Sequence, residues 1–193
     1  MQNDTSFARL VSLACHDLRT PLATVHGFAA TLAKTMELAP PADRYVEMIE
    51  AASHQLAELL DELSVAARIE GGRYEPVQRE VDTLELARAA AGRLGEDRVC
   101  VAGEGAVIET DVETVDRGVS ALVQAALRHG GLQEVAVAVA GKELHVSPVT
   151  ESSAKVVLGH DLRDLGAAVA VRVLEALGGA VTVSGPTLTI RLP

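Results

Sequence analysis

The stretch LACHDLRTPLATVHGF, residues 13–28, places together residue types that can transfer a charged group. His16 stands beside Asp17, and Thr20 follows His16 by one helical turn. A neutral imidazole is a nucleophile, and a neighbouring carboxylate can orient it or accept its proton. The hydroxyl of Thr20 can hold a water molecule. This spacing predicts a catalytic site in which His16 attacks while Asp17 and Thr20 assist.

Pro21 is an unusual residue for the interior of a helix. It cannot donate a backbone hydrogen bond to the carbonyl of Asp17, and its ring crowds that carbonyl. Such a residue costs about 3 kcal/mol in an ordinary helix interior. We therefore expect a kink at Pro21, one turn beyond His16, where local geometry matters more than helix strength.

The residues around this site have the apolar spacing of a long amphipathic helix, and a second helix of the same kind follows Pro40 and Pro41. The first apolar strip contains Phe7, Val11, Ala14, Leu18, Val25, Phe28 and Leu32. The second strip contains Tyr45, Ile49, Ala52, Leu56, Leu59, Leu63 and Ala66. These strips predict a helical hairpin, in which His16 and Thr20 lie on the face directed away from the core.

One hairpin cannot cover both strips, because each helix has only one neighbour. Two copies that pair into a four-helix bundle would bury the remaining apolar side chains. The sequence therefore predicts a homodimer.

The composition restricts the class of protein. The chain has 193 residues, a formal net charge of −10 and only 2% aromatic residues, which argues against a nucleic-acid-binding surface. No apolar run is long enough to span a membrane, and residues 1–10 do not resemble a secretory signal. Cys15 and Cys100 have no metal-ligand spacing, so we expect reduced thiols, with Cys15 in a packing role. We expect a cytoplasmic protein whose partner is another protein.

The composition changes at EGGRYEP, residues 70–76, and this predicts two domains, residues 1–72 and 73–193. In the second domain, apolar runs near residues 99–102 and in AVIET, EVAVAVA and ELHVSPV predict strands. Helices are predicted over about residues 112–129 and 162–177, and a closing hairpin in GGAVTVSGPTLTIRLP. This order of elements predicts an α/β sandwich.

The segment HDLRTPL resembles the phosphoacceptor box of two-component sensor histidine kinases, H-E/D-x-R-T-P-L, and the hairpin resembles their dimerisation and histidine-phosphotransfer domain. The resemblance implies that His16 accepts a phosphoryl group and that Asp17 acts as general base. It also implies that Thr20 positions water when a response regulator is dephosphorylated. The second domain resembles the ATP-binding domain of the same family, in the run from Asp111 to Gly130 and in the tail LEALGGAVTVSGPTLTIRLP.

The residues that would bind nucleotide in that family are replaced here. Ala121 and Ala125 stand where two asparagines would hold Mg²⁺, and an alanine methyl coordinates no metal. No Asp-x-Gly-x-Gly box follows ELHV, and Asp164 stands where a phosphate-binding glycine is expected. We therefore expect a degenerate ATPase-like domain with no cofactor and no bound metal.

The sequence thus predicts a histidine phosphotransfer protein. Its His16 would receive a phosphoryl group from a receiver aspartate or an upstream histidine kinase and pass it to a response regulator, whose receiver domain supplies the Mg²⁺. Three alternatives stay open: an ATP-dependent autokinase with an unusual nucleotide site, a response-regulator phosphatase using Thr20, and a non-enzymatic scaffold.

Overall fold

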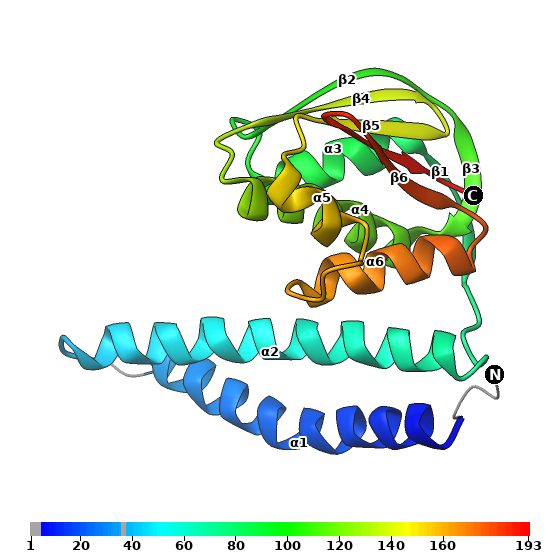
Figure 1. The fold of residues 1–193 in the computed structure, drawn as a ribbon. Helices are drawn as coiled ribbons and strands as arrows, with labels where there is room; N and C mark the ends of the chain where they lie inside the picture. The colour runs from blue at the N-terminus through cyan, green and yellow to red at the C-terminus, as the bar shows by residue number, and fades with distance from the viewer. Residues whose placement is uncertain (1–4, 36–37) are drawn as a thin grey trace. The chain divides into compact units, whose positions relative to one another are not determined.

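The computed structural model describes residues 5–35 and 38–193, which form two compact units divided after Arg73. Figure 1 shows two long N-terminal helices followed by a sheet with helices packed on it. The predicted fold class, a helical hairpin followed by an α/β sandwich, is confirmed. Residues 1–4 and 36–37 of the predicted first domain lie outside the described residues.

The first unit consists of α1 (Thr5–Thr35) and α2 (Ala42–Glu70). α1 runs through Pro21, and Figure 1 shows it changing direction part-way along its length. α2 ends where the N–H of Gly71 donates to the carbonyl of Ala67 and the chain turns at Gly72 with φ 62°. The positive φ is why a glycine is favoured at this last position.

The buried seam between α1 and α2 differs from the predicted strips. Its buried members are mostly small and lie seven or fourteen residues apart: Ala8, Cys15 and Ala29 on α1 and Val46, Ser53 and Ala67 on α2. In this single chain, Leu18, Val25 and Leu56 of the predicted strips are 55%, 49% and 52% exposed. Small side chains let two helices approach closely, whereas large side chains fit better between four helices. The packing role expected for Cys15 is confirmed, since it is 1% exposed.

The second unit contains two sheets. β1 (Gln78–Asp82) pairs antiparallel with β3 (Val107–Asp111). The larger sheet has the order β2-β4-β5-β7-β6, in which only β2 and β4 run parallel. Its strands are β2 (Val99–Gly105), β4 (Val135–Gly141), β5 (Glu143–Ser147), β6 (Ala180–Ser184) and β7 (Thr187–Arg191).

Four helices belong to this unit: α3 (Thr83–Leu94), α4 (Val112–Gly130), α5 (Glu151–Val157) and α6 (Leu165–Ala176). They cover one face of the larger sheet (Figure 1). In β4, Val135, Val137 and Val139 are buried while the alanines between them are exposed. This alternation is the pattern of a sheet with one covered face.

Three elements, α3, β1 and α5, were not predicted from the sequence, and the last helix begins later than predicted. α3 has a clear start, because the carboxylate of Asp82 accepts from the N–H of Leu84. α6 begins at Leu165 and not at Leu162, because Asp164 caps it by accepting from the N–H of Ala167. Side-chain caps of this kind are therefore the local signals that were missed.

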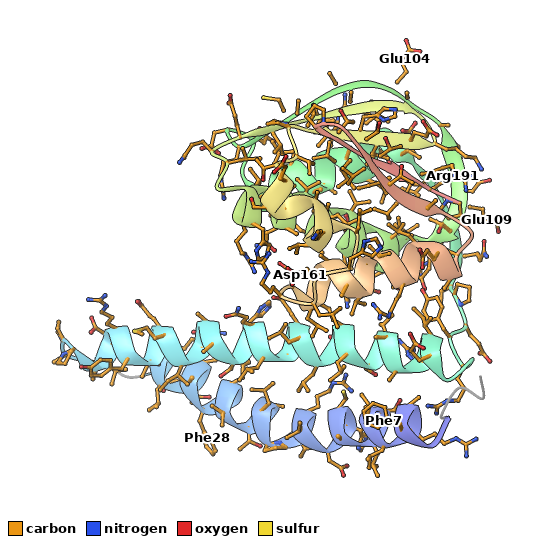
Figure 2. The ribbon with its side chains drawn as sticks, viewed as in Figure 1. Phe7, Phe28, Glu104, Glu109, Asp161 and Arg191 are labelled. Carbon is orange, nitrogen blue, oxygen red and sulfur yellow. The ribbon has the colours of Figure 1, made fainter. Side chains whose placement is uncertain are left out.

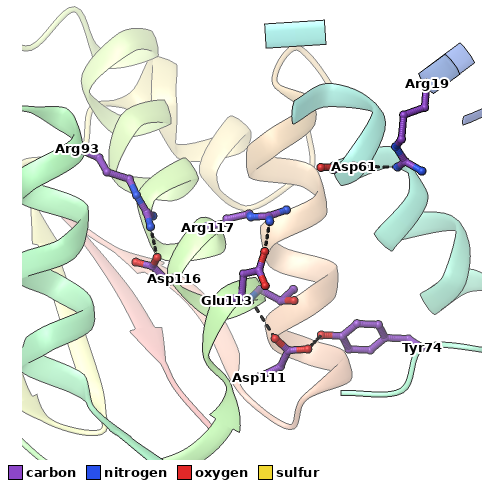
Figure 3. A network of polar contacts seen from close by, with 9 residues as sticks. Arg19, Asp61, Tyr74, Arg93, Asp111, Glu113, Asp116 and Arg117 are labelled. Carbon is purple, nitrogen blue, oxygen red and sulfur yellow. Dashed lines mark hydrogen bonds and ion pairs between the residues drawn. The ribbon is translucent and has the colours of Figure 1, made fainter. Parts of the chain in front are cut away.

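Asp111 connects the start of the second unit to α4. Its Oδ1 accepts from the N–H of Thr114, 3.1 Å away. Its Oδ2 accepts from the Tyr74 hydroxyl at 3.0 Å and from the N–H of Val77 at 3.2 Å (Figure 3). Burial raises the pKa of Asp111, but these hydrogen bonds together outweigh burial and leave the pKa below its ordinary value.

We expect Asp111→Ala to lower the free energy of unfolding by about 1–2 kcal/mol, because an N-cap and the anchors of Tyr74 and Val77 are lost. Since the pKa is lower in the folded state, the contribution of this carboxylate is present above its ordinary pKa of 3.8 and is lost as the pH falls below it. Urea unfolding from about pH 6 to about pH 3 should thus show a smaller loss of stability for Asp111→Asn than for the unmodified chain.

The control for this series is Glu104→Gln, which changes an exposed carboxylate on β2 that points into solvent (Figure 2). It should follow the pH profile of the unmodified chain. Equal profiles for Asp111→Asn and the unmodified chain would contradict the assigned role of Asp111.

Candidate functional site

A shallow depression on α1 is lined by His16, Arg19, Thr20, Ala23 and Thr24. The last four follow His16 by three, four, seven and eight positions, which places all five on one face of the helix. The side chain of His16 is 77% exposed, as the heptad spacing predicts. The depression is therefore open to a partner molecule.

Asp17 orients the imidazole of His16. Its Oδ1 lies 3.1 Å from Nδ1 of His16. Because an ionised carboxylate only accepts hydrogen bonds, this contact assigns the proton to Nδ1 and leaves the lone pair on Nε2. Nε2 is then the nitrogen that could act as a nucleophile.

Thr20 and Pro21 complete the predicted set. Thr20 is exposed on the face that carries His16, and its carbonyl accepts from the hydroxyl of Thr24 at 3.1 Å. Pro21 follows within the same helix. The structure thus places His16, Asp17, Thr20 and Pro21 together, as their short sequence separation requires.

Arg19 also belongs to this site, although no role was predicted for it from the sequence. Its Nη2 donates to Oδ1 of Asp61 on α2 over 2.7 Å (Figure 3). Beneath this pair lies Cys15, where burial raises the pKa of the thiol, Arg19 lowers it and Asp61 raises it, with a net increase. A buried thiol with a raised pKa is a poor nucleophile, so Cys15 is a weaker candidate for the reactive group than His16.

A second polar cluster joins the end of α4 to the start of α6. Oδ2 of Asp164 lies 2.9 Å from Nε2 of His129 and 3.4 Å from Nη1 of Arg128. Its Oδ1 accepts from the N–H of Ala167, 3.0 Å away. The carboxylate of Asp164 therefore occupies the N-terminus of α6, a position where backbone N–H groups favour an anion.

The helix α5 lies against α4 beside this cluster. Val156 and Val157 of α5 are completely buried in the core of the second unit. The hydroxyl of Ser152 donates to the carbonyl of His129 over 2.8 Å. The segment between β5 and α6 thus packs on α4 with its own apolar side chains.

The sequence profile of the His Kinase A (phospho-acceptor) domain matches residues 8–72, which include α2 and most of α1. This match covers His16, Asp17, Thr20 and Pro21. Over these residues the chain is similar to the phospho-acceptor domain of histidine kinases. Comparison with curated proteins gave no match.

Two of the solved structures that match share the fold of this chain. Full-length ShkA in complex with AMPPNP is 20% identical with a TM-score of 0.70, and the match covers 94% of this chain. This chain spans only 44% of the length of that ShkA chain. The Acinetobacter baumannii histidine kinase AdeS is 17% identical with a TM-score of 0.57, and the match covers 92% of this chain and 96% of AdeS. At these identities the likeness shows the fold.

The resemblance of residues 73–193 to a kinase ATP-binding domain implies a site for Mg-ATP, but the residues present do not fit that ligand. Ala125 is completely buried and Ala121 is partly buried, and neither carries an oxygen for Mg²⁺. The carboxylate of Asp164 would repel a triphosphate at the start of α6. Within residues 5–35 and 38–193, no three His, Cys, Asp or Glu side chains gather as a metal site.

A membrane-spanning helix is not found in the described part of the chain. None of its helices there combines the length and the apolar character that crossing a membrane requires.

Proposed function

We propose that this chain is a histidine phosphotransfer protein of a two-component phosphorelay. The proposal rests on one combined observation: an exposed His16 oriented by Asp17, in a chain whose ATPase-like unit has Ala121, Ala125 and Asp164 at its nucleotide positions. The phosphoryl group would come from a receiver aspartate or an upstream histidine kinase, and a response regulator would accept it. A degenerate ATPase-like domain then serves as a scaffold.

Transfer of a phosphoryl group from a receiver to His16 needs no bound nucleotide, because the receiver's aspartyl phosphate is the donor. Nε2 of His16 attacks the phosphorus of the aspartyl phosphate, the N–P bond forms, and the bond between phosphorus and the carboxyl oxygen breaks. The receiver's aspartate leaves as a carboxylate, and the Mg²⁺ bound by the receiver stabilises the charge on the transferred group. The imidazole becomes positively charged as the N–P bond forms, and Asp17 stabilises this charge through Nδ1–H. Transfer to a response regulator is the reverse reaction.

The direct test uses a panel of purified receiver domains, each carrying labelled phosphate. Label should move to this chain in an acid-labile linkage, as expected for phosphohistidine. If no receiver loses label to the chain and the chain also labels itself from ATP, the autokinase alternative replaces the relay.

Thr20 supports a second candidate function, that of a response-regulator phosphatase. Its exposed hydroxyl lines the same depression as His16, so it could hold the water that attacks a docked aspartyl phosphate. The ranking of His16 and Thr20 variants separates the two functions.

We expect millimolar Mg-ATP to leave the melting temperature unchanged. A ligand that binds only the native state at 100 times its Kd would add about 2.7 kcal/mol of stability and shift the transition visibly. Thermal melts with Mg-ATP, and with Mg²⁺ alone as control, measure this. A saturable shift with ATP would contradict the degenerate nucleotide site.

A further inference from the structure

We propose that Arg19 binds the phosphoryl group at His16 and that Asp61 is the positioning residue for Arg19. This inference rests on the proposed phosphotransfer function and assigns roles to two residues that the function does not itself specify. It starts from the depression on α1, where Arg19 is the permanently charged cation among the lining residues.

The position of Arg19 fits this role. It follows His16 by three residues, so both side chains lie on one face of α1 and line one depression. Two carboxylates accompany this pair of residues: Asp17 contacts His16, and Asp61 on α2 contacts Arg19. An incoming phosphoryl group carries about two negative charges, and the two carboxylates would repel it if Arg19 were absent.

The guanidinium keeps donors available for a phosphoryl group. Asp61 accepts from Nη2 only, through Oδ1 at 2.7 Å, and a guanidinium has five N–H donors in a planar fork. The remaining N–H groups can bind two phosphoryl oxygens at once, an arrangement that arginine favours. In the transition state the equatorial oxygens carry the charge, so a fixed guanidinium beside them lowers the barrier.

The Arg19–Asp61 pair is better suited to orientation than to stability. The two side chains are 47% and 43% exposed, and ion pairs with this exposure contribute little to folding. The pair instead spans the hairpin from α1 to α2, next to the buried Cys15. Asp61 therefore restricts the rotamers of Arg19 before the phosphoryl group arrives, which reduces the entropy lost on binding.

The experiment measures the rate at which phosphoramidate, a small phosphoryl donor, loads His16 of the full chain without any receiver. Arg19→Ala should lower this rate about 100-fold, as expected for the loss of one charged donor group. Arg19→Lys should retain part of the rate, because it keeps the charge and loses the fork. Asp61→Ala should lower the maximal loading rate about tenfold, and the phosphoramidate concentration that gives half of that rate should change less. Asp61→Glu should restore most of the maximal rate.

The double variant Arg19→Ala/Asp61→Ala tests whether Asp61 acts through Arg19. It should be no slower than Arg19→Ala alone, because the second substitution has nothing left to position. Arg9→Ala is the matched control, since Arg9 is an exposed arginine of α1 that lies two turns before His16. It should load at the unmodified rate, and all variants should melt near the unmodified temperature.

The outcomes separate this inference from the proposed function. Loading of Arg19→Ala within about twofold of the unmodified rate, additive losses in the double variant, or no loading of the unmodified chain by phosphoramidate would each overturn the roles of Arg19 and Asp61. Arg19-dependent loading from phosphoramidate, combined with no exchange of label with any receiver, would support these roles and reject the phosphorelay.

Discussion

His16→Ala should accept no detectable label from a phosphorylated receiver, whereas Thr20→Ala should accept label nearly as fast as the unmodified chain. In the relay, Nε2 of His16 forms the N–P bond, and the methyl group of alanine offers no nucleophile in its place. Thr20 lines the depression but makes no bond to phosphorus. The expected loss for His16→Ala is therefore complete within the sensitivity of the assay.

The same two variants behave differently if the chain is a phosphatase. Thr20→Ala should then slow the loss of phosphate from the receiver by a factor on the order of 10 to 1000, the effect of removing one positioning group, and no phosphohistidine should accumulate. Labelled phosphate is followed on both proteins over time for each variant. If Thr20→Ala blocks label on His16 as completely as His16→Ala does, the assigned division of roles is wrong, and Thr20 shapes the helix near Pro21.

Leu56→Glu should convert a dimer into monomers of 20.2 kDa. We propose the dimer because large apolar side chains of α1 and α2 remain exposed in the single hairpin, among them Phe7 at 64% and Phe28 at 68% (Figure 2). A four-helix bundle would bury Leu56, and a glutamate there would be an unpaired buried charge that costs several kcal/mol. Light scattering at micromolar concentration measures the mass.

Ala51→Glu is the control for this prediction. Ala51 is an exposed residue of α2 five positions before Leu56, on a different side of the helix, so its variant adds the same charge outside the apolar strip. It should remain dimeric. A monomeric unmodified chain at micromolar concentration would contradict the four-helix bundle.

The His16 site was predictable because it is local. His16, Asp17, Thr20 and Pro21 lie within six residues, and the geometry of a helix alone brings His16 and Thr20 to one face. The helical hairpin was predictable for a similar reason, since apolar spacing and the glycines at residues 71 and 72 mark where α2 runs and ends.

The seam between α1 and α2 could not be predicted in the same way. Apolar spacing identifies which side of a helix avoids water, but not which of two neighbouring strips meets the other helix of the same hairpin. Ala8, Cys15 and Ala29 are small and contribute weakly to any hydrophobic pattern, yet among the side chains of α1 that the structure describes they are the buried ones. Close approach of two helix backbones decided this, and it is a property of the folded pair.

The polar pairs across the fold depend on tertiary structure for the same reason. Arg19 and Asp61 are separated by 42 residues, and His129 and Asp164 by 35. Each residue alone is an ordinary charged or polar side chain in the sequence. Only folding brings these partners within hydrogen-bond distance, because a helix turn relates residues three or four apart and no local rule relates residues on different elements.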